Sequence, residues 1–438
     1  MSPVKKQAAW TFASSLVAAV LQIIQLAVLA RVLNVESLGI LAIVQIFIAI
    51  AFVFQDVGLS NFHIHKQQST NNQLSTLFII SFILGVLVAA FTWLMAPIVA
   101  GFYQHDQISA LLELLAIQFI LLGATALYQA EFIKKFRQVG LAKIEILCRF
   151  AAFSLTLLLL LRFELGLQAV VIGLLAGSAL KMSALWYFSA AGFHPWYRPD
   201  WSIMPQAWRY GYFQFLAQFI NQFRSQADQL IIGKLLGMEL LGFYSLAKEL
   251  ILKPGRFIQP LIQRLLMPRF AKNQDNKQQQ HQLYHQTIAI LSWSNSLLFG
   301  LIALLALPIV IILYGSDFLL TAVLISILAL FGMVRPIGAV FASIAQANGR
   351  TDIEFKWNIV AGITMLLVVI AASISKSVII VAVALSAVQT ALTIAAHYFF
   401  NHYLQTGMAI TSLKKAVAPY LLTFCCAITG IVISTAFG

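Results

Sequence analysis

The sequence has little charge for its length. Only 10% of its 438 residues are charged, whereas a soluble domain carries about 25%. Hydrophobic residues make up 61% of the chain, and the mean hydropathy is +0.88. A soluble core cannot bury this much apolar sequence. The composition therefore excludes a soluble globular protein and indicates a chain that crosses a membrane many times.

Features of enzymes and of ATP-driven pumps are also scarce. The three cysteines, Cys148, Cys425 and Cys426, lie in or beside apolar segments and form neither a disulfide framework nor a metal-ligand spacing. The sequence has no Ser-His-Asp pattern, no loop with paired carboxylates and no glycine-rich phosphate loop. The eight histidines lie in loops or near a helix end. We therefore expect no enzyme, cofactor or metal.

Long apolar runs are abundant instead. Residues 77–102, LFIISFILGVLVAAFTWLMAPIVAGF, exceed the ~20 residues that a helix needs to cross a bilayer, and they lack the alternation of a membrane barrel. The first apolar run is too long for a cleaved signal peptide, so we expect it to be retained. Hydropathy predicts thirteen membrane helices, within a range of twelve to fourteen, at residues 8–30, 38–60, 74–100, 110–133, 143–161, 166–190, 209–233, 240–266, 285–313, 319–346, 356–374, 378–400 and 414–436.

Basic residues gather in alternate loops. Seventeen Lys and Arg residues fall in loops on the side of the N-terminus, against four on the other side: Arg31, Arg162, Lys234 and Lys376. Cytoplasmic loops are the ones enriched in Lys and Arg, so the distribution predicts a cytoplasmic N-terminus. It also accounts for most of the net charge of +13 without a nucleic-acid partner.

One short sequence occurs twice. ARVLNVESLGILA, residues 30–42, returns as GKLLGMELLGFYS, residues 233–245, at an offset of 203 residues. Six predicted helices separate the copies, so both halves of the chain point the same way across the membrane. We predict an all-α polytopic membrane protein with two parallel six-helix lobes around a central cavity. The predicted parts are an N-terminal lobe (1–190), a cytoplasmic interfacial linker (191–208), a C-terminal lobe (209–404) and an additional transmembrane helix (405–438).

The same offset aligns two polar stripes. Both series advance by 4, 3, 4 and 3 residues, which keeps each series on one narrow face of a helix. A polar face in hydrocarbon is costly unless it meets water or another helix, so we expect both stripes to face the cavity. Thr11, Ser15, Ala18, Gln22 and Gln25 correspond to Gln214, Gln218, Asn221, Ser225 and Asp228.

The predicted spans also contain cations. A group of cations in a membrane cavity predicts an anionic ligand, and phosphate suits both the forked donors of Arg and the point charge of Lys. The carboxylates of Asp56 and Asp228 are candidates for ion coupling, although Asp56 could equally be a polar residue at a helix end. The seven basic residues are Arg149, Lys181, Arg224, Lys248, Lys253, Arg256 and Arg335.

Simpler interpretations of these charges stay open. Ion pairs between residues four apart on a helix would join Arg224 to Asp228. The same spacing would join Glu249 to Lys253. Other cations could extend to the lipid headgroups near the cytoplasmic side, namely Arg149, Arg256 and Arg335.

Two stretches resemble the Wzx-type flippases of polysaccharide biosynthesis, in the multidrug/oligosaccharidyl-lipid/polysaccharide superfamily. They are ARVLNVESLGILAIVQIFIAIAFVFQDVGLSN (30–61) and RSQADQLIIGKLLGMELLGFYSLAKELILKPGRFIQPLIQRLLMPRFAK (224–272). The resemblance implies transport of an undecaprenyl-diphosphate-linked oligosaccharide to the outer leaflet of the bacterial inner membrane, coupled to an H⁺ or Na⁺ gradient. The glycan would be a repeat unit of an O-antigen, capsule or exopolysaccharide. A polysaccharide polymerase and a chain-length regulator are the implied partners.

The resemblance also implies roles for residues of this sequence. The diphosphate would contact Arg224, Lys248, Lys253 and Arg256, and the sugar would contact Gln22, Gln25, Gln214, Gln218 and Asn221. Two other functions stay open. A cation-coupled multidrug exporter of the same superfamily should line its cavity with carboxylates, and basic residues predominate here. A membrane polymerase or glycosyltransferase needs a sizeable outer loop, and the predicted outer loops are about ten residues or fewer.

Overall fold

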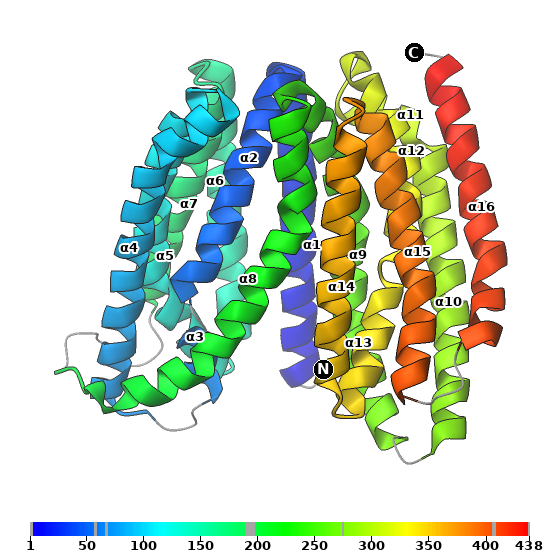
Figure 1. Cartoon of the computed structure of the whole chain (residues 1–438). Coiled ribbons are helices and arrows are strands. Elements are labelled where there is room, and N and C mark those ends of the chain that lie inside the picture. The colour runs from blue at the N-terminus through cyan, green and yellow to red at the C-terminus, as the bar shows by residue number, and fades with distance from the viewer. Residues whose placement is uncertain are drawn as a thin grey trace. The chain divides into compact units, whose positions relative to one another are not determined.

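The computed structural model describes residues 3–56, 59–65, 69–188, 198–273, 276–404 and 409–436. The described residues form helices and no strand, which confirms the predicted all-helical class (Figure 1). The elements are α1 (Pro3–Val32), α2 (Val35–Asp56), α3 (Leu59–His65), α4 (Asn71–Tyr103), α5 (Gln107–Lys134), α6 (Gln138–Arg162), α7 (Leu167–Tyr187), η1 (Trp201–Ile203), α8 (Met204–Leu235), α9 (Met238–Lys272), α10 (Lys277–Leu304), α11 (Ala306–Leu313), η2 (Ser316–Phe318), α12 (Leu319–Val334), α13 (Ile337–Ala347), α14 (Thr351–Ser373), α15 (Val378–Leu404) and α16 (Ala409–Ala436).

Each predicted span coincides with a helix, and two of the spans are broken. The span 285–313 is divided into α10 and α11, and the span 319–346 into α12 and α13. Among the described residues, ten helical stretches are long and apolar enough to cross a membrane. Helices α1, α8 and α9 carry the polar stripes and four of the seven cations, and they are not among the ten. The number thirteen therefore stays a prediction.

The chain divides into two compact units. Unit 1 comprises Met1–Leu29 and Ile40–Leu230, and unit 2 comprises Ala30–Gly39 and Ile231–Gly438. The divisions fall inside α1, α2 and α8, so each of these helices contributes residues to both units. The predicted limits of the lobes, of the linker and of the additional helix stay predictions.

In unit 1, α4 and α5 pack closely because glycines face each other. A Cβ at Gly85 would lie 2.6 Å from the carbonyl oxygen of Phe119, and a Cβ at Gly123 would lie 2.7 Å from that of Ser81. Any larger residue at either position would push the two backbones apart. Small residues at a helix crossing allow the van der Waals contact on which helix association in membranes depends.

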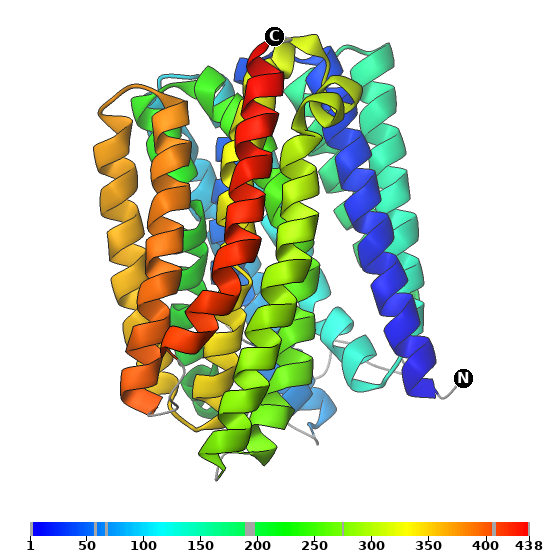
Figure 2. The same ribbon diagram turned by 90° about the vertical axis from the view of Figure 1, so that its right-hand side faces the viewer.

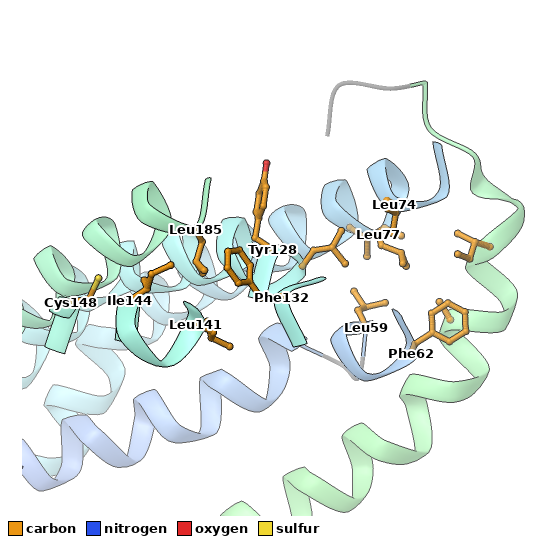
Figure 3. Packing of buried hydrophobic residues seen from close by; sticks show 14 residues of the cluster. Leu59, Phe62, Leu74, Leu77, Tyr128, Phe132, Leu141, Ile144, Cys148 and Leu185 are labelled. Carbon is orange, nitrogen blue, oxygen red and sulfur yellow. The ribbon is translucent and has the colours of Figure 1, made fainter. Parts of the chain in front are cut away.

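The short helix α3, which the sequence did not predict, is held by an apolar cluster. Its Leu59 and Phe62 belong to a group of buried side chains from α4, α5, α6 and α7 and from the start of α8 (Figure 3). The described part of the predicted linker is also held in place. The carbonyl of Asp200 accepts a hydrogen bond from Thr76 Oγ1 of α4 at 2.9 Å, and its carboxylate accepts one from the Ser202 amide at 3.0 Å. Residues 191–197 lie outside the described part.

In unit 2, α12 is the enclosed central helix. It contacts α9, α10, α15 and α16, and α16 runs beside α10 (Figure 2). The helical line from α12 into α13 is interrupted at Arg335 and Pro336, because proline has no amide hydrogen to donate. Asn295 of α10 compensates at this break: its Nδ2 donates to the carbonyl of Met333 at 3.0 Å.

The two copies of the repeated sequence meet within unit 2. A Cβ at Gly39 would overlap the carbonyl oxygen of Met238, and a Cβ at Gly242 would overlap that of Val35. With the offset of 203, Gly39 corresponds to Gly242 and Val35 to Met238. The two contacts are therefore equivalent under the repeat, and each joins the first turn of α2 to the first turn of α9.

Candidate anion-binding site

Three of the predicted cations lie on α9, a helix with clear signals at both ends. Gly237 precedes the helix with a φ of +99°, which glycine adopts without strain. Glu239 lies in the first turn and Arg269 and Lys272 lie in the last, as the helix dipole favours. Lys272 is exposed near the end of the helix, well away from the three cations.

Two of the cations of α9, Lys253 and Arg256, lie beside one carboxylate, that of Glu249. Arg256 donates to Glu249 through both terminal nitrogens, at 3.1 Å to Oε1 and 3.0 Å to Oε2, and Lys253 Nζ lies 4.0 Å from Oε1. Spacings of four and seven residues place these three side chains within about 60° of the helix surface. Lys253 is only 8% exposed and Lys248 only 5% exposed. The three cations and one carboxylate leave α9 with a surplus of positive charge here.

A pocket beside this group brings together two predicted site residues. Arg256 and Gln259 of α9 line it, together with Arg335 at the break between α12 and α13. Ile251, Leu252, Gly255, Gly332 and Pro336 complete the lining. Two guanidinium groups and an amide on one pocket provide donors for an oxyanion. The sequence did not single out Gln259, although its position three residues after Arg256 places it on the same side of the helix.

Glycines give the pocket its space. A Cβ at Gly332 would lie 2.5 Å from Cε1 of Phe299 and 2.7 Å from Cγ2 of Ile251, so glycine lets α12 approach α9 and α10 closely. Among the residues that the structure describes, and apart from the neighbouring backbone of α9 itself, no heavy atom lies within 4 Å of a Cβ built at Gly255. Arg335 also lies over the ring of Phe331, with Cζ 5.4 Å from the centroid. That contact orients a guanidinium through the negative face of the ring.

The cations of unit 1 are arranged differently. Lys181 of α7 donates to Gln129 Oε1 of α5 at 2.9 Å and to Glu145 Oε1 of α6 at 3.1 Å. These bonds tie three helices together, so the Lys181 ammonium has a structural role here. The sequence did not identify Glu145 as its partner. Arg149, one turn further along α6, is exposed.

Arg224 lies on α8 with the second polar stripe. Its terminal nitrogen donates to Asn221 Oδ1 at 3.2 Å, which joins a predicted anion-binding residue to a predicted sugar-facing residue. Ser225 Oγ donates to the carbonyl of Gln222 at 2.9 Å, and Asp228 is buried. Of the two candidates for ion coupling, Asp228 has a described side chain, and the side chain of Asp56 lies outside the described part.

The rest of the stripe is only partly described. Gln22 of α1 and Gln218 of α8 are exposed, and Gln25 is half-buried. The side chains of Thr11, Ser15 and Gln214 lie outside the part that the structure describes. An exposed glutamine on a membrane helix can contact a polar ligand or water.

Unit 1 also contains a buried ionisable group that the sequence did not predict. His63 Nε2 of α3 lies 2.6 Å from Glu131 Oε2 of α5, and Lys135 Nζ lies 2.6 Å from Glu131 Oε1. The spacing of Glu131 and Lys135 is a helical pair that sequence inspection could have found. The pairing with His63 joins segments 68 residues apart, for which the sequence carries no signal.

Comparisons with known proteins agree with this arrangement of helices. Residues 28–323 match the family described as "Polysaccharide biosynthesis protein". The amylovoran biosynthesis protein AmsL of Erwinia amylovora is 39% identical over 346 residues, which cover 78% of this chain and 88% of AmsL. This identity extends well beyond the two stretches that carried the resemblance in the sequence.

Solved structures share the fold at low sequence identity. The lipid II flippase MurJ in an inward closed conformation matches with a TM-score of 0.75 and 12% identity, over 98% of both chains. The Vibrio cholerae MATE transporter VcmN in its bent form matches with a TM-score of 0.57 and 12% identity, over 92% of this chain and 98% of VcmN. At this level of identity the likeness concerns the fold alone.

Proposed function

Because this chain belongs to the polysaccharide biosynthesis protein family, we propose that it is a flippase for a lipid-linked oligosaccharide. Its substrate would be an undecaprenyl-diphosphate-linked repeat unit of an O-antigen, capsule or exopolysaccharide. The chain would carry this substrate from the cytoplasmic to the outer leaflet of the bacterial inner membrane. The protein is a transporter in this proposal and forms no covalent bond with its substrate.

The observation that carries the proposal is the basic pocket of unit 2. Arg256, Arg335 and Gln259 line one pocket, and the buried ammonium of Lys253 shares the Glu249 carboxylate with Arg256. Desolvated cations are costly in a membrane protein unless they meet an anion, so such a group is retained where function requires it. A diphosphate supplies several acceptor oxygens on one small group, which matches two forked guanidinium groups.

The remaining parts of the substrate fit the other candidate residues. The exposed amides of Gln22, Gln218 and Asn221 offer the donors and acceptors that sugar hydroxyls require. Arg224 lies beside Asn221 in unit 1 and offers a phosphate donors there. Lobes built from parallel repeats support alternating access by rocking. The coupling ion would be H⁺ or Na⁺, with Asp228 as the described candidate.

A cation-coupled multidrug exporter is the second candidate function, since the fold of VcmN is also similar. An exporter of organic cations needs anionic side chains toward its ligand. Here the only carboxylate of the group on α9 that we describe, Glu249, is already paired with Arg256. A membrane polymerase or glycosyltransferase is a weaker candidate, because the family resemblance is to transporters.

The proposed setting follows from the same function. The protein would lie in the inner membrane as a multi-pass chain with a cytoplasmic N-terminus. A polysaccharide polymerase and a chain-length regulator would act on the substrate after it reaches the outer leaflet. These partners would meet the lipid-linked product and need no direct contact with the pocket.

Complementation tests the function in cells. Expression in a strain that lacks this gene should restore surface polysaccharide, whereas Arg224→Ala and Lys253→Ala should abolish it while the variants still insert into the membrane. Lys272→Ala, on the exposed end of the same helix, is the matched control and should restore it fully. Normal polymer levels in a variant that carries both Arg224→Ala and Lys253→Ala would contradict the proposal. Efflux of ethidium instead of restored polymer would support the multidrug exporter.

A further inference from the structure

The carboxylate of Glu249 occupies the donors that a substrate phosphate would use. Both terminal nitrogens of Arg256 point to its two oxygens at 3.0 and 3.1 Å, and Lys253 Nζ is 4.0 Å from Oε1. This two-point geometry is the one that guanidinium groups form with carboxylates and phosphates alike. The pair of N–H groups that Arg256 directs at Glu249 is therefore open to another anion only after Glu249 moves away.

The position of Glu249 makes such an exchange feasible. Its side chain is 22% exposed and that of Arg256 is 56% exposed, so neither is enclosed on all sides. Both groups lie on one helix, seven residues apart, and separate by side-chain rotation without movement of the backbone. A partly solvated ion pair contributes little free energy. A ligand that forms more hydrogen bonds with the cations than a carboxylate does can thus displace Glu249.

We propose that Glu249 is an internal competitor for the anion site of unit 2, which lowers the affinity of the site for every anion that must displace its carboxylate. This inference rests on the proposed function. A monophosphate ester offers Arg256 much the same forked contact as the carboxylate and gains little by the exchange. A diphosphate has a second phosphoryl group, which reaches Arg335 or Gln259 in the same pocket while the first replaces Glu249.

The same competition assists release. Once the diphosphate begins to leave, the Glu249 carboxylate returns to Arg256 and Lys253, so the cations do not stay exposed without an anion. A site with cations alone would hold a diphosphate tightly and release it slowly. Glu249 therefore lowers the affinity for every anion that must displace it, and the lower affinity speeds release of the substrate.

Binding of two short isoprenyl phosphates to the purified full chain tests this. The probes are farnesyl diphosphate and farnesyl monophosphate, with farnesol as the uncharged reference. We expect the wild-type chain to prefer the diphosphate. In Glu249→Gln, which keeps the shape and removes the charge, both probes should bind about fivefold more tightly. Both should also dissociate more slowly, and the preference for the diphosphate should stay the same, because both probes displace the same carboxylate. Glu113→Gln, at an exposed position of α5, should leave both affinities unchanged.

The outcomes separate the inference from the function on which it rests. If Arg256→Ala weakens both probes and Glu249→Gln leaves the monophosphate affinity unchanged or lower, the competitor role is wrong and the anion site stands. If Arg256→Ala leaves both affinities intact, the anion site itself is wrong and the proposed function loses its support. Glu249→Asp, which retracts the carboxylate by one methylene, should give a smaller gain in the same direction and serves if the Gln variant does not fold.

Discussion

Gly39 and Gly242 occupy equivalent positions of the repeated sequence, and each packs against the residue that begins the other's helix. Gly39 lies on the carbonyl of Met238, and Gly242 lies on the carbonyl of Val35. A side chain at either position would overlap a backbone oxygen. The repeated sequence thus encodes a pair of reciprocal backbone contacts, which explains why glycine stands at both positions.

A methyl group at these glycines should separate the starts of α2 and α9. We expect Gly39→Ala and Gly242→Ala each to lower the free energy of unfolding by about 1–3 kcal/mol, the usual cost of overpacking. Gly101→Ala is the control, because no heavy atom of the described residues, apart from the neighbouring backbone of α4, lies within 4 Å of a Cβ at that position. It should be neutral or stabilising by about 0.5–1 kcal/mol. Thermal unfolding of the purified variants measures all three, and equal midpoints would refute the contact.

The hydrogen bond that Asn295 donates should stabilise the break between α12 and α13. Its side chain is 1% exposed and donates to the carbonyl of Met333. Asn295→Ala leaves that carbonyl without this donor, which costs about 1–3 kcal/mol for a buried group. Asn273→Ala removes a similar bond to the carbonyl of Arg269 at an exposed site and should cost much less. Equal losses of thermal stability in the two variants would show that burial of the bond is unimportant.

The contacts of Glu131 with His63 and Lys135 should stabilise unit 1 strongly. Glu131 is 9% exposed at its side chain and accepts contacts from His63 and Lys135. Glu131→Gln removes the negative charge between two basic groups, and breaking a buried pair in this way costs about 3 kcal/mol. Glu113→Gln, which is exposed, should change stability little. Unfolding in denaturant compares them, and an unchanged midpoint for Glu131→Gln would exclude the structural role.

The space at Gly255 offers a way to block the pocket without removing a charge. A phenylalanine there meets no heavy atom within 4 Å of its Cβ and extends into the pocket. We expect Gly255→Phe to fold and to lose farnesyl diphosphate binding by more than about tenfold, since the ring occupies the ligand's place. Gly338→Phe, also in open space and outside the pocket lining, should keep wild-type affinity.

Hydropathy and charge were sufficient to predict most of the helices, because a membrane span needs a long apolar segment and little else. The breaks at Leu305 and at Arg335–Pro336 were not predicted, since an apolar average does not change where the backbone is interrupted. Pro336 was the available signal. The short helix α3 was missed because seven residues are too few to alter a hydropathy window.

The sequence predicted the types of residue at the site better than their partners. Of the seven predicted cations, Arg256 and Arg335 share a pocket, and the role of the seven stays a prediction. Arg256 and Arg335 are 79 residues apart in the chain, so helical spacing does not predict that they meet. The pair of Glu249 and Lys253 follows from i,i+4 spacing, whereas the two-point bond of Glu249 with Arg256 depends on side-chain rotation. Spacing alone cannot predict such a rotation.

Transport in a defined membrane tests the central claim most directly. Liposomes with the purified chain and a fluorescent diphosphate-linked oligosaccharide lipid would report how much lipid becomes accessible in the opposite leaflet. The wild-type chain and Lys272→Ala should move the lipid equally well, and the double variant Arg256→Ala/Arg335→Ala should lose more than about tenfold of the rate, since both forked donors are gone. A double variant that moves the lipid at the wild-type rate would contradict a diphosphate site in this pocket.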